Sequence, residues 1–138
     1  MKTLQEFPPN YDEIRKILVN IPETMVFVFG DTIYNPSGNE IVPALEAHEA
    51  HHSLQQGKSP QTWWRRYLTD GAFRASQEIP AYQMQYRQYK KEIKDRNKLN
   101  NILIGLAMEL SSPAYGSIIS TQEAMEAIKT DKLYNFRV

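Results

Sequence analysis

The first helical stripe of the chain is short. Ile14, Ile17 and Leu18 recur at three- and four-residue spacing, which places their apolar side chains on one face of a helix. Asn10 is of a residue type that favours the helix N-cap, and Pro22 stops the pattern. The pattern therefore predicts a short helix between Asn10 and Pro22.

The next apolar run has a different character. Residues 24–29, with the sequence TMVFVF, are dense in β-branched and aromatic side chains, as in a buried strand. Gly30 and Asp31 suit a tight turn into a second, shorter strand at Thr32 to Tyr34, and the following NPSGN has the composition of a loop. We therefore expect two short strands joined by a tight turn.

In the rest of the chain, apolar residues recur at helical spacing. The segment Pro43–Gln56 starts with proline, contains no breaker and is followed by Gly57, which suits a helix C-terminus. Pro80 falls inside a long helical pattern and should kink it near Ser76, whose carbonyl loses its donor. One further helix is predicted to start at Pro60, and two follow the apolar stripes at 75–93 and 99–110. A last helix is predicted to start near Thr121.

This order of elements predicts the fold class. Strands precede the helix at 43–56, and only helices follow it. We expect an α+β fold, a mostly helical single domain over residues 1–138 with a small β-sheet before that helix.

Composition and charge narrow the classes of function. Sixteen acidic residues balance sixteen basic ones, so no overall field favours nucleic acid or an acidic membrane. The absence of cysteine excludes disulfides and thiolate metal sites. The N-terminal MKTLQEFPPNYDEI lacks the apolar core of a secretory signal, and the longest apolar run, LNNILIGLAMEL, is too short for a bilayer. We therefore expect a cytoplasmic protein without a membrane partner.

All three histidines of the chain lie in the sequence HEAHH, within the predicted helix at 43–56. His48 and His52 are four residues apart, so their imidazoles share one helix face and can converge on one zinc ion. Glu49 lies about 100° from His48 around the helix axis, where it can reach a metal-bound water as a general base. His51 is displaced from that face and is predicted to be a packing or rim residue.

Two histidines need a third protein ligand, which must be a carboxylate because no histidine remains. Glu78 is the best candidate, since it neighbours the inward stripe of the long helix and would carry a desolvation cost there without a partner. Asp70 is the second candidate, although its place before Gly71 also suits a helix cap.

HEAHHSLQQG followed by ASQEIPAY resembles the minimal zincin metallopeptidases of the glutamate-ligand type, the gluzincins, including small phage-borne and bacterial members. The similarity covers roughly residues 25 to 82. The resemblance implies zinc on His48, His52 and Glu78, with Glu49 as the base. It also implies that an edge strand beside the active helix, near Asp31 to Tyr34, binds the substrate backbone.

The reaction predicted from this site is hydrolysis of a peptide or protein substrate. Zinc lowers the pKa of its water towards about 7 and polarises the scissile carbonyl, while Glu49 takes the proton and delivers it to the leaving amine. The developing oxyanion needs a further donor. Tyr115, in the polar break SSPAYGS, is our candidate, with a packing role as the alternative.

Two alternative functions use other features. A di-iron carboxylate bundle would use Glu49 and His52 as one E-x-x-H pair, but it needs a second pair on another helix, and no histidine is left for it. Nucleic-acid binding would use TWWRRY and the basic YRQYKKEIKDRNK. However, Trp63 and Trp64 are more typical of packing anchors, and the balanced total charge disfavours this function.

The third alternative is a zinc-stabilised binding module without catalytic activity. Such a module needs the metal ligands but has no use for the base. The presence of Glu49 between the ligands therefore favours a peptidase.

Overall fold

The structure is a computed structural model and describes residues 1–134. Its α-helices and strands follow in the order β1 (Lys2–Leu4), α1 (Tyr11–Ile17), β2 (Phe27–Phe29), β3 (Thr32–Tyr34), α2 (Pro43–Gln56), α3 (Pro60–Thr69), α4 (Gly71–Glu92), α5 (Arg96–Leu110) and α6 (Thr121–Lys129). A 3₁₀ turn, Pro113–Tyr115, lies between α5 and α6. The α+β class with a small sheet before α2 is confirmed.

The sheet has three strands in the order β1-β3-β2. Strands β2 and β3 form an antiparallel hairpin in which Phe29 pairs with Thr32, and Gly30, at a φ of 65°, helps to form the two-residue turn. Strand β1 pairs in parallel with β3 on its other side and was not expected from the sequence. The prediction of an edge strand at Asp31 to Tyr34 is therefore wrong, because β3 is the central strand.

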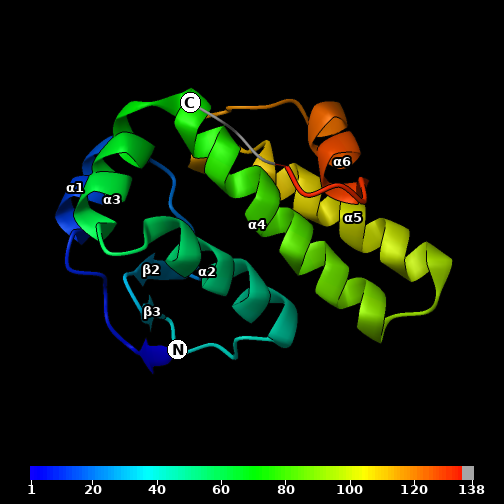
Figure 1. The fold of residues 1–138 in the computed structure, drawn as a ribbon, viewed down its shortest axis with the longest axis horizontal. Coiled ribbons are helices and arrows are strands. Elements are labelled where there is room, and N and C mark those ends of the chain that lie inside the picture. Colours follow the sequence, from blue (N-terminus) through cyan, green and yellow to red (C-terminus); the bar gives the residue numbers. More distant parts are fainter. Residues whose placement is uncertain (135–138) are drawn as a thin grey trace.

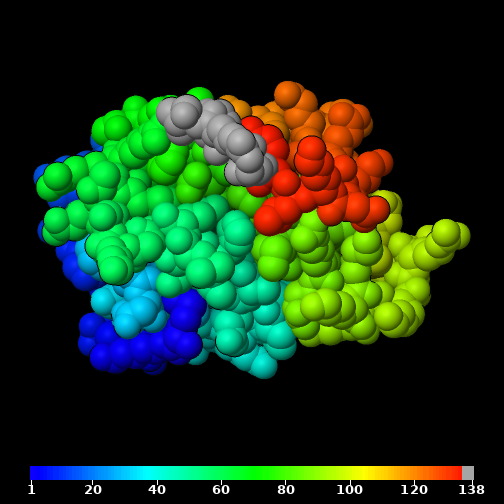
Figure 2. All heavy atoms as spheres, viewed as in Figure 1, coloured from blue at the N-terminus to red at the C-terminus, as the bar shows by residue number. Residues whose placement is uncertain are grey.

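Helix α4 lies at the centre of the helical part of the fold (Figure 1). It contacts α2, α3, α5 and α6, and it continues through Pro80 to Glu92. Figure 2 shows the N-terminal strands at one end of the molecule and α6 on the opposite side, with α2 and α4 between them. The pairing of α2 with α4 positions the candidate site.

Two apolar clusters form the core, and both include residues of α4. One joins α4, α5 and α6 through residues such as Tyr82 and Leu110. The other joins α1, α3 and β2 and includes Trp63 and Trp64, which are both buried, as expected for packing anchors. The indole of Trp64 donates a hydrogen bond to the backbone oxygen of Val28, so α3 is held against β2. None of the described helices has the length and hydropathy needed to cross a membrane.

Candidate metal centre

The His-His-Glu triad, formed by His48, His52 and Glu78, lies at the contact between α2 and α4. Glu78 Oε1 is 3.2 Å from His48 Nε2 and 3.1 Å from His52 Nε2. All three side chains are buried. The two imidazoles reach Glu78 because residues four apart share the face of α2 that packs against α4. The structure thus brings together the three residues that the sequence predicted as metal ligands.

Two glutamines orient the imidazoles. His48 Nδ1 is 2.9 Å from Gln85 Oε1, and His52 Nδ1 is 2.8 Å from Gln55 Oε1. An amide oxygen only accepts hydrogen bonds, so each Nδ1 carries the hydrogen and donates it. The amide of Gln55 is itself fixed, because its Nε2 donates to the backbone oxygen of Gln77. When neutral, each ring therefore directs the Nε2 lone pair towards the triad, as metal-binding histidines do.

The triad needs a positive charge at its centre. A neutral imidazole with its hydrogen on Nδ1 would present the Nε2 lone pair to the Glu78 carboxylate, which is repulsive unless a proton or a metal ion lies between them. Ligands about 2.0–2.1 Å from a tetrahedral zinc are about 3.3 Å apart, close to the distances of 3.2 and 3.1 Å in the triad. Two imidazoles and one carboxylate also form a known catalytic zinc donor set. The triad therefore fits a metal ion.

The pKa values of these groups without a metal follow from the same contacts. Burial would lower the pKa of His52, but the charge of Glu78 and its hydrogen bond to the ring raise this pKa to about 9. Burial would raise the pKa of Glu78, but the two imidazoles hold it well below its usual range. Protons and a metal ion therefore compete for the same buried site.

Glu49 lies beside the triad and does not belong to it. Its side chain is buried, at 5% exposure, and burial raises the pKa of its carboxyl above the ordinary value. The Glu49 oxygens are not among the fully buried polar atoms that lack a partner, and Glu49 lines both cavities beside the triad, so its carboxylate is reached from the cavity. An accessible carboxylate of raised pKa has the properties expected of a general base.

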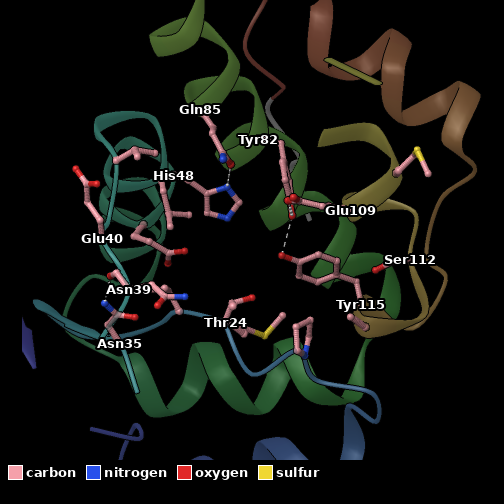
Figure 3. Close-up of a pocket in the computed structure, with 18 of the residues that line it drawn as sticks. Thr24, Asn35, Asn39, Glu40, His48, Tyr82, Gln85, Glu109, Ser112 and Tyr115 are labelled. Carbon is pink, nitrogen blue, oxygen red and sulfur yellow. Dashed lines mark hydrogen bonds between the residues drawn. The ribbon is translucent and has the colours of Figure 1, made fainter. Parts of the chain in front are cut away.

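A cavity of about 600 Å³ adjoins the triad (Figure 3). His48 and Glu49 line it, and they also line a second, smaller cavity that reaches His52 and Glu78. Apolar and aromatic side chains make up much of the wall of the larger cavity, including Met25, Val42, Leu45, Tyr82, Tyr89 and Met108. Its size and lining are typical of a small-ligand or peptide site.

Tyr115 lines both cavities. Its hydroxyl is 2.9 Å from the hydroxyl of Tyr82, whose ring packs edge-on against His48 at a centroid distance of 4.6 Å. The backbone oxygen of Tyr115 accepts a hydrogen bond from Arg74, a buried residue of α4. This hydrogen bond holds the loop after α5 against α4, the helix that carries Glu78. It explains how Tyr115 reaches the site although it is distant in sequence.

The remaining candidates lie away from the triad. Asp70 caps α4 by accepting a hydrogen bond from the backbone nitrogen of Phe73. His51 is only half-buried, and burial, followed by the charges of His52 and His48, lowers its pKa to about 4. Its ring is therefore neutral at pH 7.

Sequence reasoning missed the residues that support the ligands. Glu78 Oε2 accepts a hydrogen bond of 2.5 Å from the hydroxyl of Tyr67 on α3. Gln85 follows Glu78 by seven residues and so returns to the same face of α4. The sequence did contain a signal for Gln85, a polar residue at helical spacing on a buried stripe, but it contained none for Tyr67.

Comparisons of the chain with protein families, curated proteins and solved structures find no match.

Proposed function

We propose that the protein is a zinc-dependent peptidase in which Glu49 is the general base. The observation that carries this proposal is the Glu49 side chain, which is buried beside the His-His-Glu triad, has a raised pKa and lines a cavity of about 600 Å³. A structural metal site is normally closed by four protein ligands, whereas a catalytic site uses three and leaves one position open. The described residues supply three.

His48, His52 and Glu78 would hold the metal. When bound, zinc would supply an acidified water and a polarised scissile carbonyl. Glu49 accepts a proton from the attacking water and later donates it to the leaving amine. The burial that raises the pKa of Glu49 favours this role, because the protonated form must be accessible for the second transfer.

The hydroxyl of Tyr115 is the candidate donor to the oxyanion. Tyr82 has a single hydroxyl hydrogen, which it can give to Tyr115 or to the carboxylate of Glu109 at 3.3 Å. When Tyr82 donates to Tyr115, the hydrogen of Tyr115 is free for a substrate in the cavity. The role assigned to Tyr115 therefore uses one of the two hydrogen-bond arrangements of this tyrosine pair.

Glu49→Gln tests the assignment. Glutamine keeps the size of the side chain but cannot accept the proton, so the variant should bind zinc and fold like the wild type. Peptide hydrolysis should fall by several orders of magnitude, measured by mass spectrometry on a broad peptide library. Equal cleavage by Glu49→Gln and the wild type would overturn the mechanism.

The alternative is a zinc-stabilised binding module without activity, which requires only the triad. A wild-type protein that holds zinc and cleaves nothing in the same library would favour that module. Glu49 supports the peptidase, because a module that only holds the metal and a ligand has no use for a buried carboxylate of raised pKa beside the triad.

A further inference from the structure

The charged side chains that line the large cavity all have the same sign. They are Glu40, Glu49 and Glu109, and no lysine or arginine of the described chain lines this cavity. The protein as a whole has no net charge, so this bias belongs to the cavity and not to the overall composition. A cleft lined by one sign of charge and apolar walls raises the local concentration of oppositely charged ligands.

Glu109, on α5, lines the cavity. Its only hydrogen bond within residues 1–134 comes from a neutral donor, the hydroxyl of Tyr82, at 3.3 Å. No ion pair in this part of the chain involves Glu109. The ring of Tyr82 in turn contacts His48. The carboxylate of Glu109 is therefore separated from the triad by one side chain and keeps capacity to accept further hydrogen bonds.

Glu40 lies on the opposite wall (Figure 3). The loop that precedes it is held by Asn35, which is buried, donates to the backbone oxygen of Asn39 at 2.7 Å, and accepts from Ser37. The long side chains of Met25 and Met108 also line the cavity and offer apolar surface. Apolar walls with a terminal carboxylate suit the aliphatic stem and the charged head of lysine or arginine.

We propose that this cavity selects substrates that carry a cationic nitrogen close to the scissile bond, with Glu109 as the specificity-determining carboxylate and Glu40 as a second acidic wall. The selected group is the side chain of lysine or arginine, or the free amino terminus of a peptide. The expected cleavage preference rests on the proposed peptidase function, whereas the expected binding preference does not.

Three octapeptide pools test the proposal. All are acetylated and amidated, share the same mixed flanking residues, and carry lysine, norleucine or glutamate at one central position. The wild-type kcat/KM for the lysine pool should exceed that for the norleucine pool by about tenfold, the effect of one partly desolvated charge pair. The glutamate pool should be the poorest. A fourth pool, with norleucine and a free amino terminus, distinguishes the amino-terminal source from the side chain.

Glu109→Gln is the decisive variant, because it removes the charge but can still accept a hydrogen bond from Tyr82. It should bring the lysine and norleucine pools within about threefold of each other, with the larger drop in kcat/KM on the lysine pool. Glu46→Gln is the matched control, since Glu46 is exposed on α2 and does not line the cavity. This control should keep the preference for lysine.

Binding of the same pools to the Glu49→Gln protein, measured by calorimetry, tests this inference without requiring the proposed peptidase activity. The lysine pool should bind about tenfold more tightly than the norleucine pool, and Glu109→Gln in that background should remove the difference. If the wild type cleaves no pool but this binding difference is seen, the peptidase function fails and the inference holds. Cleavage or binding without a preference for lysine, or a preference that survives Glu109→Gln, would overturn the inference.

Discussion

The hydroxyl of Tyr67 donates a hydrogen bond of 2.5 Å to Glu78 Oε2, while Glu78 Oε1 faces the two imidazoles of the triad. Both side chains are buried. The two oxygens of one carboxylate thus have separate partners, because α3 holds one and α2 meets the other. This division fixes the rotation of the Glu78 side chain before any metal binds.

Removing the Tyr67 hydroxyl should therefore weaken metal binding more than it weakens the fold. Tyr67→Phe keeps the ring that stacks on Trp63 and removes only the donor. We expect zinc affinity to fall by about 10–100-fold, as for other residues that orient metal ligands, measured by competition with a chromogenic chelator. Tyr86→Phe is the control, because Tyr86 lies on α4 and its hydroxyl has no hydrogen bond within the described chain. Equal affinity in both variants would contradict this orienting role.

The ligands themselves should have a larger effect. Purified protein should hold about one zinc ion per chain, because the described residues form one His-His-Glu group of this kind. Alanine at His48, His52 or Glu78 should each remove most of the zinc, as measured by elemental analysis. His51→Ala should keep full occupancy, since His51 lies outside the triad. Full zinc in the Glu78 variant would remove this residue from the ligand set.

Local signals explain why α2 was predictable from the sequence. Proline at the first helical position and Gly57 after the last residue, at a φ of 54°, fix both ends of this helix independently of the rest of the fold. The hairpin of β2 and β3 was predictable for the same reason. Strand β1 was not, because it has three residues, none of them buried, and depends on pairing with β3 far along the chain.

In the candidate site, too, some residues were predictable from local sequence patterns, and others are brought in only by the packing of helices. Helical spacing alone places His48 and His52 on one face, and the inward stripe of α4 indicated Glu78. The contacts of Tyr67 and Gln55 depend on how α3 and α4 pack against α2, and no periodicity within one helix carries that information. The central position of β3 likewise followed from the pairing of β1, which reversed the expectation for an edge strand.

The metal-free protein should lose stability as the pH rises. The pKa of His52 is raised to about 9 in the folded state, from an ordinary value of 6.5, so the folded chain binds this proton more tightly than the unfolded chain. The resulting stabilisation is fully present below pH 6.5 and is lost as the pH rises through 9. It amounts to at most about 3 kcal/mol, measured by urea denaturation between pH 6 and pH 10.

Two comparisons isolate this contribution from other titrating groups. Metal-free His52→Gln should lack the decline, because glutamine does not titrate. With zinc bound, the trend should reverse over the same range, since deprotonated imidazoles bind the metal more tightly. A metal-free wild type with the same pH dependence as His52→Gln would contradict the coupling between His52 and Glu78.

Tyr115→Phe tests the proposed oxyanion donor. The ring would stay packed against both apolar clusters, and zinc should bind as in the wild type, because Tyr115 does not belong to the triad. Only a hydrogen bond that strengthens as charge develops would be lost, so kcat should fall by about 10²–10³-fold with little change in KM. Tyr82→Phe is the informative companion, because it removes the partner hydroxyl at 2.9 Å and leaves the hydroxyl of Tyr115 in place. Its kcat should fall less than that of Tyr115→Phe. If Tyr115→Phe kept wild-type kcat while Tyr82→Phe lost it, Tyr115 would be a packing residue and the donor would have to be sought at Tyr82.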